Sequence, residues 1–338
     1  MNRLAKLFAC WLGLLFAGSL AAADKPSGDP SILPAGAVLD EIWNEGEFTE
    51  GVAVGPDGVV YFSDIAFKAE EAGRILKFDP KTGKTTVHCA DSGKSNGLFF
   101  DAKGRLIAAC GANNGHRAIV EIKPDGSVKK LYDKFEGKKF NAPNDLVIDS
   151  QGRIFFSDPR YVGPEPLEID MQSVYRIDTD GSIQRVTTTK QISKPNGVHL
   201  SPDEQTLYIA ETDNGSFDVT KEPDEKPELK MTLNAFELRP DGTLGKKTVL
   251  VKFGQETGTD GMTIDTRGNI YAAVRKESRH GIVVFTPEGK ELAYIPTDDL
   301  PTNCTFGRGD DGSTLYVTAG GGLYRIKLKT TGSHPTGK

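Results

Sequence analysis

Six oxygen-bearing side chains stand at matching places along the chain, each directly before a short apolar run: Glu50, Asn96, Asn144, Asn196, Asp260 and Asn303. Carboxylate and carboxamide oxygens are ligands that hard divalent cations prefer, whereas soft-ligand zinc sites use Cys or His. The two carboxylates would balance a divalent charge. The set therefore favours a Ca²⁺, Mg²⁺ or Mn²⁺ site. A single Asn-Gly pair, taken alone, is equally typical of a turn.

The apolar runs that follow these six residues form a repeat. In residues 52–62 two β-branched or aromatic runs flank Asp57-Gly58, and residues 98–108 and 146–156 follow the same plan. Such a pattern is typical of a β-hairpin with a glycine turn. The copies recur about every 43 to 64 residues, a spacing found in propellers. The sequence therefore predicts an all-β fold, a six-bladed β-propeller with four short antiparallel strands per blade.

The last repeat lacks an outer strand after Leu328, and residues 37–43 are expected to supply it and close the ring. This places one propeller domain at residues 37–328. Residues 24–36, rich in Pro, Gly and Asp, are predicted to be a flexible lead-in. Residues 329–338 are predicted to be a disordered tail.

Residues 1–23 have the three parts of a secretory signal peptide. Arg3 and Lys6 precede an apolar run from Leu7 to about Leu20, and small residues at 21–23 offer a cleavage site. We expect a periplasmic or secreted protein, with an uncleaved anchor as the alternative. No later segment is apolar enough to span a membrane. The net charge of −6 and the scattered basic residues argue against nucleic acid as a partner.

Three cysteines remain after such a cleavage: Cys89, Cys110 and Cys304. Cys89 and Cys110 lie in neighbouring repeats and could pair, and three buried thiols are the alternative. An insertion from about Asp213 to Met231 is either a lid over the channel or a solvated loop. The oligomeric state stays open.

Five motifs in this order resemble the gluconolactonase/regucalcin (senescence marker protein) family of six-bladed lactonases, especially its bacterial gluconolactonase-like branch. They are Thr49-Glu50-Gly51, Asn141-Ala-Pro-Asn144-Asp145, Lys194-Pro-Asn196-Gly197, Thr259-Asp260-Gly261-Met262 and Pro301-Thr-Asn303-Cys-Thr-Phe306. Together with the repeats, the resemblance covers residues 37–328.

The resemblance implies one divalent cation in the channel, held by Glu50, Asn196 and Asp260. Ca²⁺ is the first expectation, with Mg²⁺, Mn²⁺ and Zn²⁺ as alternatives. It also implies hydrolysis of a lactone, a sugar lactone such as gluconolactone or a similar small cyclic ester. Asp260 is then expected to activate the attacking water as general base. Asn144 is expected nearby, in contact with water or substrate.

The sequence departs from regucalcin-type members at Ala142, where they carry an Arg that helps to hold the sugar. Arg117 resembles a basic residue of bacterial gluconolactonases and is expected to contact substrate instead, with a surface arginine as the alternative. Asn96 and Asn303 are expected to contact water or substrate as members of the repeat. The alternative function is a non-catalytic, Ca²⁺-stabilised propeller that binds a small ligand or a protein partner.

Overall fold

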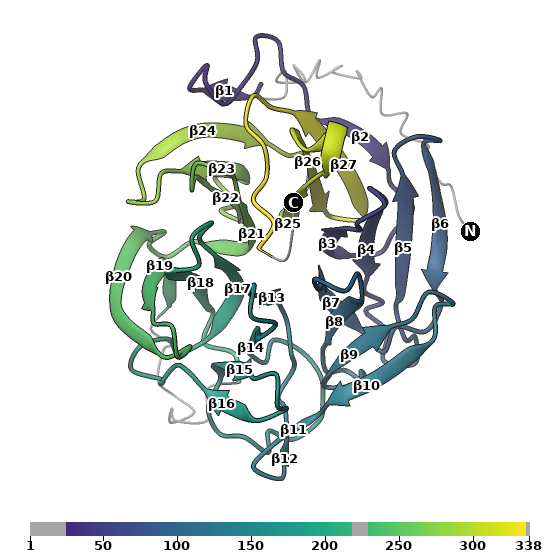
Figure 1. Ribbon diagram of the computed structural model, residues 1–338, viewed down its shortest axis with the longest axis vertical. Helices are drawn as coiled ribbons and strands as arrows, with labels where there is room; N and C mark the ends of the chain where they lie inside the picture. Colours follow the sequence, from purple (N-terminus) through teal and green to yellow (C-terminus); the bar gives the residue numbers. More distant parts are fainter. Residues whose placement is uncertain (1–24, 218–228, 336–338) are drawn as a thin grey trace, which may run out of the picture.

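In the computed structural model, which describes residues 25–217 and 229–335, six antiparallel sheets surround a central axis (Figure 1). The prediction of an all-β six-bladed propeller is confirmed. Within the described residues the helical content is one 3₁₀ turn, η1 (Gly309–Asp311). Each blade begins with its innermost strand and runs outward, so the short apolar runs of the repeat become the buried inner strands.

The blades follow the chain in order. Blade 1 contains β3 (Thr49–Val54), β4 (Val60–Asp64), β5 (Arg74–Asp79) and β6 (Lys84–Cys89). Blade 2 contains β7 (Ser95–Phe100), β8 (Leu106–Cys110), β9 (Ala118–Ile122) and β10 (Val128–Tyr132). A small hairpin, β11 (Lys134–Phe135) and β12 (Lys138–Lys139), precedes blade 3. Blade 3 contains β13 (Leu146–Ile148), β14 (Ile154–Asp158), β15 (Ser173–Ile177) and β16 (Ile183–Arg185).

The second half repeats the arrangement. Blade 4 contains β17 (Pro195–Leu200), β18 (Thr206–Asp213), β19 (Lys230–Leu238) and β20 (Leu244–Lys252). Blade 5 contains β21 (Thr259–Ile264), β22 (Ile270–Val274), β23 (Gly281–Phe285) and β24 (Glu291–Pro296). Blade 6 contains β25 (Pro301–Phe306), β26 (Thr314–Ala319), β27 (Gly322–Lys327) and, from the N-terminal part, β2 (Asp40–Trp43).

The ring closes through β2, which pairs with β27 and places Asp40 opposite Arg325. Trp43 then packs edge-on against Phe62 of blade 1, with ring centroids 5.2 Å apart. This confirms that residues 37–43 supply the missing outer strand. Because the first and last parts of the chain pair within one blade, the two ends of the propeller are joined by backbone hydrogen bonds.

The lead-in is packed, and the prediction of a flexible segment is wrong for its described part, residues 25–36. A short strand, β1 (Ser27–Gly28), extends blade 5 by pairing with β24. Ile32 is 1% exposed and joins the apolar cluster between blades 5 and 6. The polar composition of this segment hid one apolar pair, Ile32-Leu33, which the folded ring buries.

The C-terminal segment is also held, so the prediction of disorder is wrong for residues 329–335. The backbone N–H of Lys329 donates to the Ile32 carbonyl at 2.8 Å, and that of Ser333 donates to the Ile264 carbonyl at 2.9 Å. Figure 1 shows this yellow segment running inward from the rim toward the middle of the ring, beside β21 and β25. Polar backbone groups left at the ends of inner strands bind it there.

This segment lies at the end of the channel opposite the six residues that open the repeats. Asp260 is the second residue of β21, whereas Ile264 is its last. The His334 ring nitrogen Nε2 lies 3.0 Å from the Gly307 carbonyl oxygen, just after β25. Burial lowers the pKa of His334 to about 4, and also that of His199 on β17.

Three cysteines of the described residues, Cys89, Cys110 and Cys304, are free and buried. Pairing of Cys89 with Cys110 does not occur, and burial raises the pKa of the Cys110 thiol. Residues 1–23, predicted as a signal peptide, and the middle of the 213–231 insertion lie outside the described residues. No helix in the part of the chain that the structure describes is long and apolar enough to cross a membrane.

Replacing Ile32 by Ala tests the packing of the lead-in. We expect the free energy of unfolding to fall by about 2–4 kcal/mol, because a buried isoleucine is removed from a core cluster. Val38→Ala is the control, since Val38 is 62% exposed and should change stability by less than about 0.5 kcal/mol. Urea unfolding measures both. Equal effects of the two changes would contradict the packing.

We expect acid to destabilise the folded protein through His334, which lies in the C-terminal segment. The folded-state pKa of His334 is about 4, below its ordinary 6.5, so the unfolded chain binds the proton first and stability falls as pH drops from 6.5 toward 4. At pH 5 one such histidine costs about 2 kcal/mol. Urea unfolding at pH 7 and 5 should show a smaller acid loss in His334→Gln. An unchanged acid loss in the variant would disprove a neutral, buried His334.

Candidate functional site

The inner strands are bulged where the predicted site residues stand. In five blades the register between the first two strands shifts next to these residues, which a β-bulge produces by setting two residues against one. The shifts fall between Glu50 and Ala53, Ser95 and Leu98, Pro195 and Val198, Thr259 and Met262, and Pro301 and Asn303. A bulge re-aims side chains, so these residues can turn from the sheet toward the channel.

The glycines after these residues allow neighbouring inner strands to approach closely. Gly51 has φ +38°, and a Cβ there would lie 1.8 Å from the Asn96 carbonyl oxygen. A Cβ on Gly197 would lie 2.3 Å from the Asp260 carbonyl oxygen. Any side chain at either place would push two blades apart. The Glu-Gly and Asn-Gly pairs are therefore requirements of the ring as well as of the site.

Hydroxyl groups bind three of the strand starts to a neighbouring blade. Ser63 donates through Oγ to the Asn96 carbonyl oxygen at 2.8 Å. Thr212 donates in the same way to the Thr259 carbonyl oxygen at 2.7 Å. Thr302 donates to the Thr49 carbonyl oxygen at 2.8 Å. Because these donors sit in buried positions, the backbone of the channel mouth is held rigidly.

A cavity of about 420 Å³ opens at this mouth, and five of the six predicted residues line it: Glu50, Asn96, Asn144, Asn196 and Asp260. Asn303 lies outside the lining. Its Oδ1 accepts the N–H of Cys304 at 2.8 Å, and its side chain fills the space beside Gly261. Asn303 therefore supports the strand start, and the expected contact with water or substrate does not follow from its position.

Arg117 also lies outside the cavity lining, contrary to the expected substrate contact. Its Nε donates to the Phe140 carbonyl oxygen at 2.8 Å, and it is 7% exposed. The fully buried Arg160 donates through Nη2 to the Asn141 carbonyl oxygen at 2.7 Å. Because their guanidinium groups are occupied by main-chain carbonyls, both arginines position the loop that carries Asn144.

Two buried carboxylates form the floor of the cavity. Glu50 is 3% exposed and Asp260 is 8% exposed. Burial raises the pKa of Asp260, and Arg275 acts against that shift. Burial raises the pKa of Glu50 well above its usual range, and the charge of Asp260 raises it further. Two like charges at this depth need a positive partner.

Arg275 and Tyr161 line the cavity and were missed in the sequence. Arg275 Nη1 donates to Asp260 Oδ2 at 3.0 Å. The register of the β21–β22 hairpin could have located Arg275. Thr259 pairs with Val274 in this hairpin, which brings the next residue, Arg275, beside Asp260. Burial raises the pKa of Tyr161 well above its usual range, and its hydroxyl donates to the Thr212 carbonyl oxygen at 3.1 Å.

Asn196 fits a cation at this floor. Its side-chain amide is hydrogen-bonded to Asp260, while its Oδ1 is buried and has no hydrogen-bond partner. Buried polar atoms are normally satisfied, so an orphaned oxygen beside two carboxylates suits a hard cation. Across the described residues no three His, Cys, Asp or Glu side chains gather as metal ligands. A cation here would bind two carboxylates together with amide oxygens.

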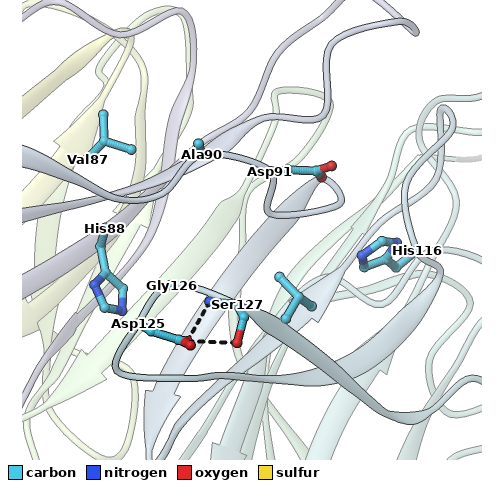
Figure 2. Close-up of a pocket in the computed structure, with 9 residues that line it drawn as sticks. Val87, His88, Ala90, Asp91, His116, Asp125, Gly126 and Ser127 are labelled. Carbon is cyan, nitrogen blue, oxygen red and sulfur yellow. Dashed lines mark hydrogen bonds between the residues drawn. The ribbon is translucent and has the colours of Figure 1, made fainter.

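A second cavity, of about 640 Å³, lies at the outer strands of blades 1 and 2 (Figure 2). Figure 2 shows His88 and His116 on opposite sides of it. The Asp125 carboxylate accepts hydrogen bonds from the N–H and Oγ of Ser127, at 3.0 and 2.7 Å. Asp125 and Ser127 thus stabilise a turn, and the two histidines on opposite sides do not converge with them on one point.

A propeller with an oxygen-lined mouth is the class that this fold and site define. Residues 48–321 match the SMP-30/Gluconolactonase/LRE-like region family, and the chain belongs to that family. The match covers most of the ring and includes all the residues that line the cavity floor.

Named relatives agree with this assignment. The chain is 31% identical to a gluconolactonase of Zymomonas mobilis over 70% of its own length and 64% of the relative's. It is 29% identical to the lactonase drp35 of Staphylococcus epidermidis, over 82% of this chain and 75% of that one. Other curated relatives are longer still, and the match spans as little as 34% of them.

A solved gluconolactonase structure from Xanthomonas campestris superposes with a TM-score of 0.76 at 29% identity. The superposition covers 91% of this chain and 96% of that one. The whole propeller is therefore shared.

Replacing Arg275 by Gln tests how much its charge stabilises the fold by compensating for the buried carboxylate of Asp260. We expect Arg275→Gln to lower the free energy of unfolding by about 2–4 kcal/mol without added metal, because Asp260 keeps its charge and loses its partner. Arg279→Gln is the matched control, since Arg279 pairs with Glu291 at the surface, where side chains are 45% and 42% exposed. That change should cost less than about 1 kcal/mol.

Urea unfolding in chelator measures both arginine variants. Adding Asp260→Asn to Arg275→Gln should restore part of the loss, because the uncompensated charge is removed. A destabilisation by Arg275→Gln no larger than that of Arg279→Gln would contradict the electrostatic role.

Proposed function

We propose that this protein hydrolyses a lactone, a sugar lactone such as gluconolactone or a similar small cyclic ester, with one divalent cation bound at the channel mouth. One observation carries the proposal: the unpartnered Asn196 Oδ1 lies in one cavity with the buried carboxylates of Glu50 and Asp260. The names of its gluconolactonase and lactonase relatives support the reaction type.

Glu50, Asn196 and Asp260 would hold the cation, with Ca²⁺ first and Mg²⁺, Mn²⁺ or Zn²⁺ as alternatives. The cation, when bound, supplies Lewis-acid polarisation of the lactone carbonyl. Asn96 and Asn144, on the starts of neighbouring blades, offer amide groups that orient water or the ring.

Asp260 acts as general base in this proposal. It takes a proton from the attacking water, the water oxygen bonds to the carbonyl carbon, and the ring C–O bond breaks. The departing alkoxide takes the proton from Asp260, which returns to the carboxylate, and the product is an open hydroxy acid. Arg275 supports this role, since its guanidinium opposes the rise in the Asp260 pKa that burial causes.

The compartment is proposed from residues 1–23 alone. A cationic start, an apolar run and small residues at 21–23 favour export to the periplasm or the medium.

Asp260→Asn should reduce turnover of gluconolactone by about 10²–10⁴-fold, because the general base is lost. Asp241→Asn is the control, since it changes an exposed turn carboxylate of blade 4 whose partner is Thr243. The rate above spontaneous hydrolysis is measured after chelation, with and without added Ca²⁺. Thermal unfolding of each protein shows that the fold is retained.

Full wild-type turnover in chelator would contradict the metal-dependent reaction. A Ca²⁺-dependent rise in melting temperature with no turnover on any lactone would favour the alternative, a cation-stabilised propeller that binds a ligand or a partner.

A further inference from the structure

The walls of the 420 Å³ cavity are apolar, in contrast to its charged floor. Phe48 lies just before β3, and Ile65 and Phe67 follow β4. Val162 follows β14, and Leu300 precedes β25. All these loops stand at the end of the ring where the inner strands begin, so they rise around the mouth above Glu50 and Asp260.

Two of these wall residues are held in an exposed position. Phe67 is 61% exposed and Val162 is 60% exposed, although both are large apolar side chains. Phe67 also contacts Phe48, with the two rings tilted and their centroids 5.5 Å apart. Exposed apolar groups that converge on the rim of a cavity mark a ligand-binding surface, because burying them against a ligand removes them from water.

Three of the polar groups in the walls already have partners. Lys94 donates through Nζ to the carbonyl oxygens of Ala66 and Lys68, at 2.5 and 2.6 Å. The Tyr161 hydroxyl donates to a main-chain carbonyl, and Asn113 Nδ2 donates to the Phe67 carbonyl oxygen at 2.9 Å. A hydroxyl group placed against Phe67 or Val162 would lose water and gain no hydrogen bond from these occupied groups, which penalises binding at that part of the wall.

We infer that the preferred substrate is a lactone whose ring carries an apolar substituent, an alkyl or aryl group that lies against Phe67 and Val162 while the ester group reaches the floor. This inference rests on the proposed lactone hydrolysis for its reaction, and on the cavity walls alone for its substrate class.

The test is a series of δ-lactones from the unsubstituted ring to pentyl-substituted rings, compared with glucono-δ-lactone in the presence of Ca²⁺. We expect kcat/KM to rise about threefold for each of the first added methylenes, as burial of apolar surface predicts. Glucono-δ-lactone should be a poorer substrate than the butyl-substituted ring. Binding of the ring-opened hydroxy acids, measured by calorimetry, gives the same comparison without turnover.

Val162→Ser and Val87→Ser form a matched pair. Both valines are exposed, at 60% and 50%, but Val87 lines the other cavity, at the outer strands (Figure 2). Val162→Ser should remove most of the gain in kcat/KM per methylene. Val87→Ser should leave the whole series unchanged.

The outcomes separate this inference from the proposed function. Hydrolysis of gluconolactone and unsubstituted lactones with no gain from added carbons overturns the apolar substrate class and leaves the reaction intact. A chain-length gain in calorimetry without turnover supports the ligand class and rejects lactone hydrolysis. Equal effects of Val162→Ser and Val87→Ser would place the apolar contact elsewhere and overturn the assignment to these walls.

Discussion

Six inner strands must begin at one level around a narrow axis, and this close approach is the constraint on which the rest of the structure depends. It is met where a backbone of one blade touches the next without a side chain between them, as at Gly51 against the Asn96 carbonyl. The bulges beside five of the six starts each free a side chain from the sheet. Ring closure and the gathering of polar side chains at the mouth are thus one geometric solution.

This solution has an electrostatic cost. Glu50 and Asp260 are brought together at 3% and 8% exposure, where each carboxylate loses its water and feels the other's charge. Arg275 compensates for one of them. The unpartnered Asn196 Oδ1 shows that hydrogen bonding within the protein does not complete the site. Such strain is commonly kept at functional sites, because residues that stabilise the fold best are not those that bind a ligand best.

The repeat and its polar starts could be predicted because their signals are local. A hairpin is specified by two apolar runs and a glycine turn, as in residues 52–62, and the residue before each run needs no knowledge of distant contacts. Arg275 was missed because its place beside Asp260 depends on the register of a whole hairpin. Register is fixed by tertiary burial as much as by sequence.

The wrong predictions for the lead-in and for Arg117 also arose because their contacts involve distant parts of the chain. Ile32 sits among Pro, Gly and Asp residues that are typical of a linker, and the blade 5–6 cluster that buries it is assembled from residues about 240 to 300 positions away. Arg117 was expected at the mouth because a basic residue can bind a polar substrate. Its guanidinium instead binds the carbonyls of residues 140 and 141, which sequence cannot place in its reach.

Floor and walls of the cavity come from separate parts of the fold. The floor belongs to the strand starts, where bulges, glycines and buried hydroxyls leave little freedom. The walls belong to loops such as residues 65–67, in which the Phe67 backbone is held by Glu47 and Asn113 while its ring contacts Phe48 and stays largely exposed. Substitutions at the exposed wall residues Phe67 and Val162 are therefore expected to leave the polar floor in place, whereas Phe48 lies under the Arg275 guanidinium that pairs with Asp260. A propeller of this kind can change the substituent it accepts while keeping the chemistry of its floor.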